Sequence, residues 1–221
     1  MKLSPTALKK IASRGQTLGE YFYLRTKLGS DPVYEEAAKR LASPALPILD
    51  IGCGMGLLTH YLREGGNKAP MTSFDFDARK IESAKAMSQK AGYDDVSFAV
   101  GDARHELPDH QGHVVILDIL QFMKSDDQAT LLRLAASRVA PGGNCIIRSC
   151  LRDDSHRFKI TVLGDWFARI TLWMKESPVW YPTAADFKEV LSSAGLTVTI
   201  VPLWGGTPFN NHLIVAQRPM E

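Results

Sequence analysis

Three glycines at alternate positions follow a short apolar run near the start of this chain. Residues 47–56 read PILDIGCGMG. The apolar run bounded by Pro47 and Gly52 predicts a buried strand of a parallel sheet. Glycines directly after such a strand let the backbone turn sharply and approach a ligand closely, because they carry no Cβ. This segment therefore predicts an α/β fold with a ligand at the end of a strand.

Several nucleotide cofactors bind at a glycine-rich turn of this kind. A dinucleotide fingerprint needs glycines at its first, third and sixth positions, which here are Gly52, Gly54 and Leu57, so the third requirement fails. No Gly-Lys-Ser/Thr follows, which excludes a P-loop. A purely structural turn from strand to helix remains an alternative on these residues alone.

Strand-like and helix-like patterns alternate from residue 47 onward, which indicates a layered α/β sheet. The last two strands are joined by the Gly/Pro-rich turn 204–210 and must pair antiparallel. We expect strands over 48–51, 71–75, 96–100, 114–120, 145–150, 196–203 and 212–217, and helices over 57–64, 79–91, 126–140 and 183–193.

Length and composition fit one large globular domain. The chain has 221 residues, 45% of them hydrophobic, and a net charge of +2. Its basic residues are scattered and form no stripe, so we expect no nucleic-acid partner. The three cysteines have no disulfide or metal spacing, the N-terminus resembles no signal peptide, and no run is long enough for a membrane span. We expect a cytoplasmic protein.

Five motifs together resemble the class I S-adenosylmethionine (SAM)-dependent methyltransferases. They are D-x-G-x-G-x-G from Asp50, Asp75 at the end of the second strand, Gly-Asp-Ala at 101–103, Asp118 in VVILDIL, and Ala-Pro-Gly-Gly at 140–143. The resemblance implies a Rossmann-like seven-stranded sheet of order 3-2-1-4-5-7-6, with an antiparallel last strand and helices on both faces. It covers residues 46–218, with an aromatic-rich insert at 152–182 and an N-terminal helical cap at 1–45.

The resemblance also implies the residues that bind SAM. Asp75 is assigned to the ribose hydroxyls in preference to Asp77, which directly precedes a helix and fits its N-cap. Phe76 flanks the adenine, Asp102 accepts from its amino group, and Ala103 donates its backbone N–H. The expected cofactor-binding set is Asp50, Gly52, Cys53, Gly54, Gly56, Asp75, Phe76, Asp102, Ala103 and Asp118, the last of which borders the methionine portion and the substrate.

A general base is needed only where the methyl acceptor arrives protonated. The fourth strand runs into Gln121 and Phe122, where many relatives carry a histidine. His156 is a weak candidate for that base, and a solvated loop residue is the other interpretation. Although His156 could bind a metal together with Asp153 and Asp154, we expect no metal site.

Residues 158–181 contain three of the four tryptophans, with apolar residues at a helical spacing. Core packing or a homodimer face, a lid over the acceptor, and a membrane-surface helix all remain open for this segment. Trp166 and Trp173 are candidates to bind the acceptor.

Two further segments supply acceptor-binding candidates. Tyr23 and Lys27 belong to an N-terminal segment that either closes over the cofactor or forms a surface amphipathic helix, and Asn211 follows the last turn. The motifs K-L-x-x-D-P-V-Y at 27–34 and W-G-x-T-P-F-N-N at 204–211 resemble methyltransferases of bacterial aryl-polyene and polyketide-type pigment clusters.

The sequence thus predicts methyl transfer from SAM to a small apolar metabolite, aromatic or acyl-linked, free or attached to a carrier protein. Two alternatives stay open at this point. One is an NAD(P)-dependent oxidoreductase, and the other is a non-catalytic partner subunit with the SAM-binding fold.

Overall fold

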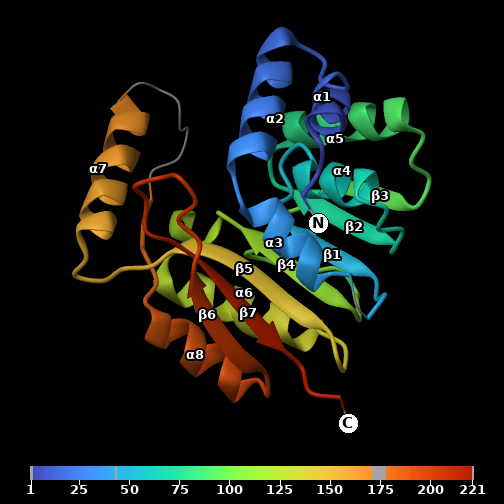
Figure 1. Ribbon diagram of the computed structural model, residues 1–221. Helices are drawn as coiled ribbons and strands as arrows, with labels where there is room; N and C mark the ends of the chain where they lie inside the picture. The colour runs from blue at the N-terminus through green and yellow to red at the C-terminus, as the bar shows by residue number, and fades with distance from the viewer. Residues whose placement is uncertain (1, 43, 171–177, 221) are drawn as a thin grey trace.

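The computed structural model describes residues 2–42, 44–170 and 178–220, with the side chains of 165–170 left out. Its centre is a seven-stranded sheet of order β3-β2-β1-β4-β5-β7-β6, which confirms the predicted order (Figure 1). The strands are β1 (Ile48–Ile51), β2 (Met71–Asp75), β3 (Val96–Val100), β4 (His113–Leu117), β5 (Asn144–Cys150), β6 (Thr197–Pro202) and β7 (Asn211–Gln217).

The first five strands run parallel, so their carboxyl ends meet at one edge of the sheet. Strand β1 pairs with β2 on one side and with β4 on the other, and β4 pairs with β5. Strand β7 pairs antiparallel with both β5 and β6. Cys150 and Asn211 face each other in this register, so β7 begins at the edge where β5 ends.

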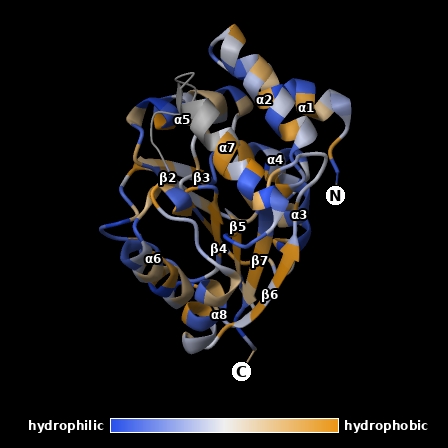
Figure 2. Ribbon diagram, turned by 90° about the vertical axis from the view of Figure 1, so that its left-hand side faces the viewer, coloured by the Kyte–Doolittle hydropathy of each residue, from blue (hydrophilic) through white to orange (hydrophobic). Residues whose placement is uncertain are grey.

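Helices cover both faces of the sheet, as predicted. Helices α6 and α8 pack with one face of the central strands, whereas α1 to α4 pack with the other. Figure 2 shows the apolar residues concentrated along β4, β5 and β7 between these layers. The helices are α1 (Pro5–Ala12), α2 (Leu18–Ser30), α3 (Val33–Arg40), α4 (Leu57–Glu64), α5 (Ala78–Ala91), α6 (Ser125–Ser137), α7 (His156–Ile170) and α8 (Ala184–Ser193).

The N-terminal helices belong to the main core rather than to a separate one. Leu24 and Leu28 of α2 are buried together with Leu58 of α4 and Ile146 of β5. Full burial of one leucine or isoleucine side chain stabilises the fold by roughly 1.5–3 kcal/mol. Helices α1 to α3 therefore share one core with α4 and the central strands.

The fourth strand is shorter than the sequence pattern predicts. It ends at Leu117 because Asp118 adopts a positive φ of 61°, and a short 3-10 helix, η1 (Leu120–Phe122), follows. A non-glycine residue rarely adopts this conformation, which costs energy and is maintained by surrounding contacts. The apolar pattern continued through this point and gave no sign of the break.

Helix α7 lies in the aromatic-rich insert and is attached to the turn between β6 and β7. Arg157 Nη1 donates to the backbone oxygen of Thr207 at 2.8 Å, and Thr161 Oγ1 accepts from the backbone N–H of Asn210 at 2.9 Å. Among the described residues, no helix is both long enough and apolar enough to cross a membrane.

Candidate functional site

The glycine turn after β1 presents its backbone to the carboxyl edge of the sheet. Gly52 and Gly54 have φ angles of 74° and 55°, which favour glycine. A Cβ at Gly52 would lie 2.5 Å from Ile119 Cγ2, so Gly52 is needed for packing against the end of β4. A Cβ at Gly54 would meet nothing closer than Lys80 Cδ at 4.0 Å. Gly54 therefore leaves an open backbone surface for a ligand.

Asp75 at the end of β2 is tied to this turn. One carboxylate oxygen accepts the backbone N–H of Gly54 at 2.9 Å, and the other accepts the backbone N–H of Asp77 at the same distance. Asp77 itself caps α5 by accepting the N–H of Arg79, as its position in the sequence predicted. A carboxylate offers about four lone-pair positions, so Asp75 keeps capacity for two further donors.

Asp50 carries an unsatisfied oxygen beneath the same turn. The residue is buried, and its Oδ2 has no hydrogen-bond partner within the part of the chain that the structure describes. Burial and the neighbouring charge of Asp75 raise the pKa of Asp50 to about 7. A buried acceptor without a donor points to a ligand group that donates to it.

These residues line one cavity of about 750 Å³, within the range of small-molecule sites. Asp102 and Ala103 lie at one end of it, and Tyr23 and Lys27 of α2 line it at the other. Hydrogen bonds from Arg104 lower the pKa of Asp102 to about 2, so that this carboxylate is ionised. The cavity joins the predicted cofactor residues, apart from Gly56, to the two N-terminal candidates.

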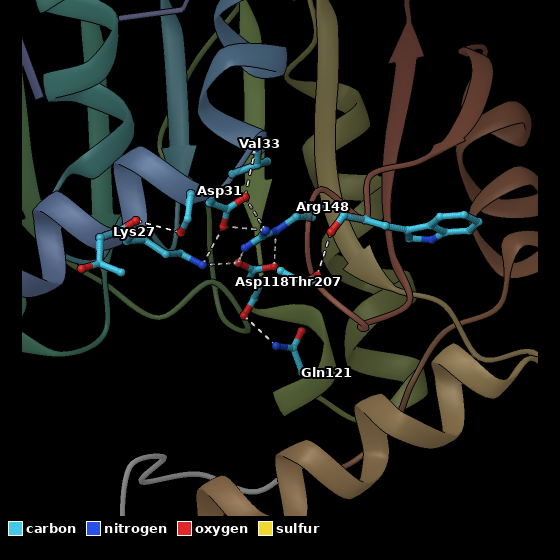
Figure 3. Close-up of polar contacts among 10 residues, drawn as sticks. Lys27, Asp31, Val33, Asp118, Gln121, Arg148 and Thr207 are labelled. Carbon is cyan, nitrogen blue, oxygen red and sulfur yellow. Dashed lines mark hydrogen bonds and ion pairs between the residues drawn. The ribbon is translucent and has the colours of Figure 1, made fainter. Parts of the chain in front are cut away.

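A network of four charged side chains lies beside the cavity (Figure 3), and two of its members, Lys27 and Asp118, line it. Buried Arg148 of β5 donates to both oxygens of Asp118 and, through Nη1, to the two oxygens of Asp31 at 2.8 and 2.7 Å. Lys27 Nζ lies 2.8 Å from Asp31 Oδ2 and 3.8 Å from Asp118 Oδ2. Burial alone would raise the pKa of Asp31, but the two cations outweigh it and hold the pKa below its usual value.

Reasoning from the sequence missed Arg148 and Asp31. An arginine inside the apolar strand CIIRSC is a signal that a carboxylate lies nearby, because a buried charge needs a partner. Asp31 lies in the 27–34 motif, which was singled out without a role for this residue.

The remaining candidates differ in where they lie and in whether the structure describes them. His156 is exposed at the start of α7, and neither it nor Asn211 is among the residues that line the cavity. Trp166 belongs to α7, but its side chain is not described, and Trp173 falls outside the described residues. Cys53 does line the cavity, and burial raises the pKa of its thiol, which keeps it protonated.

Asp153, one of the three side chains considered above for a metal site, forms hydrogen bonds with protein groups. Its Oδ2 accepts from Asn210 Nδ2 at 2.8 Å, and its Oδ1 accepts the backbone N–H of Ser155. Within the described residues, no group of histidine, cysteine and acidic side chains is arranged to hold a metal ion.

Comparisons with known proteins agree with this geometry. A family model described as a methyltransferase domain matches residues 42–195. The ribosomal protein L11 methyltransferase of Burkholderia vietnamiensis is 27% identical over 154 residues, which make up 70% of this chain and 47% of that protein. The ubiquinone biosynthesis O-methyltransferase of Methylobacterium nodulans is 28% identical over 210 residues, covering 87% of this chain and 78% of that protein. The chain thus spans about half the length of the L11 methyltransferase it matches.

Solved structures show the same fold. The pyocyanin biosynthetic protein PhzM superposes with a TM-score of 0.67 at 22% identity, over 96% of this chain and 61% of that one. The magnesium protoporphyrin IX methyltransferase ChlM of Synechocystis, solved with bound S-adenosylhomocysteine (SAH), gives 0.68 at 17% identity, over 96% and 93%.

Proposed function

This chain belongs to the class I SAM-dependent methyltransferase family, and we propose that it transfers the SAM methyl group to a small apolar acceptor, aromatic or acyl-linked. The acceptor binds at the end of the cavity lined by α2. We further propose that the protein acts in the cytoplasm, without a nucleic-acid partner.

The observation that carries this proposal is the continuity of the cavity. One end lies at the glycine turn, Asp75 and Asp102, and the other lies at Tyr23 and Lys27. A single continuous cavity of this size accommodates a cofactor and a small second molecule side by side. Tyr23 and Lys27 of α2 and Tyr34 of α3 all line this cavity, so both helices contribute to the acceptor end.

The residues present fit SAM. The free lone pairs of Asp75 suit the two ribose hydroxyls, and the unsatisfied Oδ2 of Asp50 suits the ammonium group of the methionine portion. Phe76 and Ala103 line the cavity where the adenine is expected, and Gly54 leaves room for close approach of the ligand. When bound, SAM supplies a methyl group on a sulfonium, which is already an activated leaving group.

The protein's own contribution is therefore orientation and the exclusion of water. The rigid turn at Gly52, packed against Ile119, fixes the position of the cofactor-binding backbone relative to the end of β4. Tyr23 and Lys27, one helical turn apart on α2, face the same cavity from the other side. An acceptor held between them meets the methyl group in a restricted set of orientations.

Binding measurements test the cofactor assignment. Isothermal titration calorimetry with SAM, SAH and NADH is expected to show binding of SAM and SAH only. Binding of NADH alone would contradict the proposal and support an oxidoreductase. Binding of SAM without transfer to any acceptor would support a non-catalytic subunit instead.

A panel of acceptors tests the substrate class. Purified protein and radiolabelled SAM are incubated with phenolic compounds, acyl thioesters and ribosomal protein L11, the last because one relative is named for it. We expect label in phenolic or acyl products. Label in L11 alone would show that the acceptor is a protein and would overturn the small-molecule assignment.

A further inference from the structure

The pair Lys27 and Asp118 is the most informative feature of the acceptor end of the cavity. Their side chains are 31% and 35% exposed, whereas Arg148 behind them is 5% exposed. Both line the cavity. These two are therefore the members of the charged network that a bound molecule can reach.

The geometry of the pair leaves room for a third polar atom. Lys27 Nζ and Asp118 Oδ2 are 3.8 Å apart, beyond the usual hydrogen-bond distance, although Lys27 bonds Asp31 at 2.8 Å (Figure 3). An ammonium has three donor positions, and a carboxylate oxygen keeps a lone pair beyond the one used by Arg148. A donor and an acceptor thus face the cavity side by side.

The charges in this network balance. Two cations, Lys27 and Arg148, are matched by two carboxylates, Asp31 and Asp118. Asp118 would repel a bound anion, and Lys27 would repel a bound cation. Each repulsion would weaken binding in a partly desolvated site. A neutral group that both donates and accepts a hydrogen bond satisfies the pair without that cost. A hydroxyl is such a group.

We propose that Lys27 and Asp118 bind the hydroxyl group of the acceptor, which makes the protein an O-methyltransferase for neutral phenols or alcohols. The inference rests on the proposed function. Lys27 donates to the hydroxyl oxygen, and the hydroxyl donates to Asp118 Oδ2. As the new C–O bond forms, the proton passes to Asp118 and then to solvent, and the electrons of the broken C–S bond stay on the sulfur of the methyl donor.

Asp118 is paired with Arg148, and a strong base is not needed in this position. A hydroxyl oxygen that is acquiring a methyl group becomes strongly acidic, so its proton leaves readily. Asp118 therefore touches the reacting group, while Lys27 orients it. The positive φ of Asp118, 61°, directs its side chain to this place from the end of β4.

The test uses SAH-loaded protein and three probes of similar shape, namely 2-naphthol, 2-methoxynaphthalene and 2-naphthoate. We expect 2-naphthol to bind at least about tenfold more tightly than the other two, because they lack either the donor or the neutral charge. Lys27→Met is expected to abolish this preference while leaving SAH affinity unchanged. Lys80→Met is the matched control, since Lys80 also lines the cavity but at the glycine turn.

Three results would overturn the inference. The first is equal or undetectable binding of 2-naphthol and 2-methoxynaphthalene to the wild-type protein. The second is a preference that survives in Lys27→Met. The third is a loss of SAH affinity in Lys27→Met with 5′-methylthioadenosine binding unchanged, which would place Lys27 at the carboxylate of the cofactor.

A second variant keeps the test independent of any folding defect. Asp118→Asn retains a hydrogen-bond acceptor but cannot take the proton. We expect it to bind 2-naphthol nearly as well as the wild type and to lower kcat of naphthol methylation at least about tenfold. Failure of the wild-type protein to bind SAM or SAH would instead contradict the proposed function itself.

Discussion

Arg148 of β5 and Asp118, which follows β4, form a bidentate ion pair between these two neighbouring strands. Arg148 Nε donates to Asp118 Oδ1 at 2.6 Å, and Nη2 donates to Oδ2. The remaining nitrogen of Arg148 binds both oxygens of Asp31, at the corner between α2 and α3. One buried guanidinium therefore fixes both the end of β4 and the N-terminal helices that line the cavity.

Replacement of Arg148 is expected to destabilise the fold. Arg148→Met leaves Asp31 buried beside Asp118 with one cation in place of two. Removing one partner of a buried ion pair lowers the free energy of unfolding by about 3–5 kcal/mol. We expect a loss of about 3 kcal/mol here, because Asp118 is partly exposed. The free energy of unfolding in urea measures this loss.

The matched control for that measurement is Arg104→Met. Arg104 pairs with Asp102 at 2.5 Å, but its side chain is 52% exposed. Exposed pairs contribute at most about 1 kcal/mol. Equal losses in the two variants would show that burial of Arg148 is not what gives its ion pairs their effect on stability.

Alanine variants of Asp75 and Asp77 are expected to distinguish a role in cofactor binding from a role in helix capping. Asp75→Ala should weaken SAM binding at least about tenfold, because it removes a charged acceptor for the ribose and releases the N–H of Gly54. Asp77→Ala should cost about 1 kcal/mol of stability, as the loss of an N-cap does, with little change in SAM affinity. Calorimetry and urea unfolding on both variants distinguish the roles, and the reverse pattern would assign the ribose to Asp77.

The ionisation of Asp50 is expected to make stability depend on pH. Its pKa in the folded protein is about 7, against a usual 3.8, so the folded state holds a proton that the unfolded chain releases. The free energy of unfolding should therefore fall as pH rises from about 4 to about 7, by up to about 4 kcal/mol in total. Below about pH 4 both states are protonated, and the contribution is constant.

Asp50→Asn removes this ionisation and provides the comparison. We expect the variant to lose less stability than the wild type between about pH 4 and 7, measured by urea unfolding at several pH values. Parallel curves for the two proteins would show that Asp50 does not titrate in this range.

Gly52 and Gly54 are expected to respond differently to alanine. Both have positive φ, which costs a substituted residue about 1–2 kcal/mol. Gly52→Ala also forces a Cβ against Ile119, so it should destabilise the fold further. Gly54→Ala meets open space and should mainly reduce SAM affinity. Thermal melting with calorimetry checks this, and equal melting temperatures would argue against the contact with Ile119.

Much of the fold could be predicted because its signals are local. Short apolar runs bounded by turn residues marked the central strands, and the antiparallel hairpin followed from the short turn at 204–210. The break at Asp118 could not be predicted in this way, since Asp118 is bound there by the side chain of Arg148, which lies 30 positions further along the chain. The partnership of Arg148 with Asp31 joins residues 117 positions apart, and no periodicity records such a contact.

In the candidate site, too, residues with a local sequence signal were easier to predict than the others. Gly54, Asp75 and Asp102 were found because their positions at strand ends fit a known pattern, although their binding roles stay predictions. His156 was chosen for its chemistry, but it is exposed at the start of α7 and does not line the cavity. For His156, residue type alone did not predict a place in the cavity wall, and its role as a base stays a prediction.

The Asn210 side chain is expected to hold in place the segment 151–155 that leads into α7. It is 1% exposed, and its Nδ2 donates to the backbone oxygen of Leu151 and to Asp153 Oδ2, both at 2.8 Å. Its backbone N–H donates to Thr161 of α7. Asn210→Ala leaves the Leu151 oxygen without its side-chain donor, which should cost about 1–3 kcal/mol of stability.

The same change tests whether α7 contributes to acceptor binding. If α7 forms part of the acceptor site, loosening it should raise the KM for the acceptor and leave SAM affinity unchanged. Arg218→Met is a suitable control, since Arg218 holds the opposite end of the hairpin through backbone oxygens of Val139 and Ala136. A comparable rise in KM from the control would mean that general loosening of β7, rather than the position of α7, governs acceptor binding.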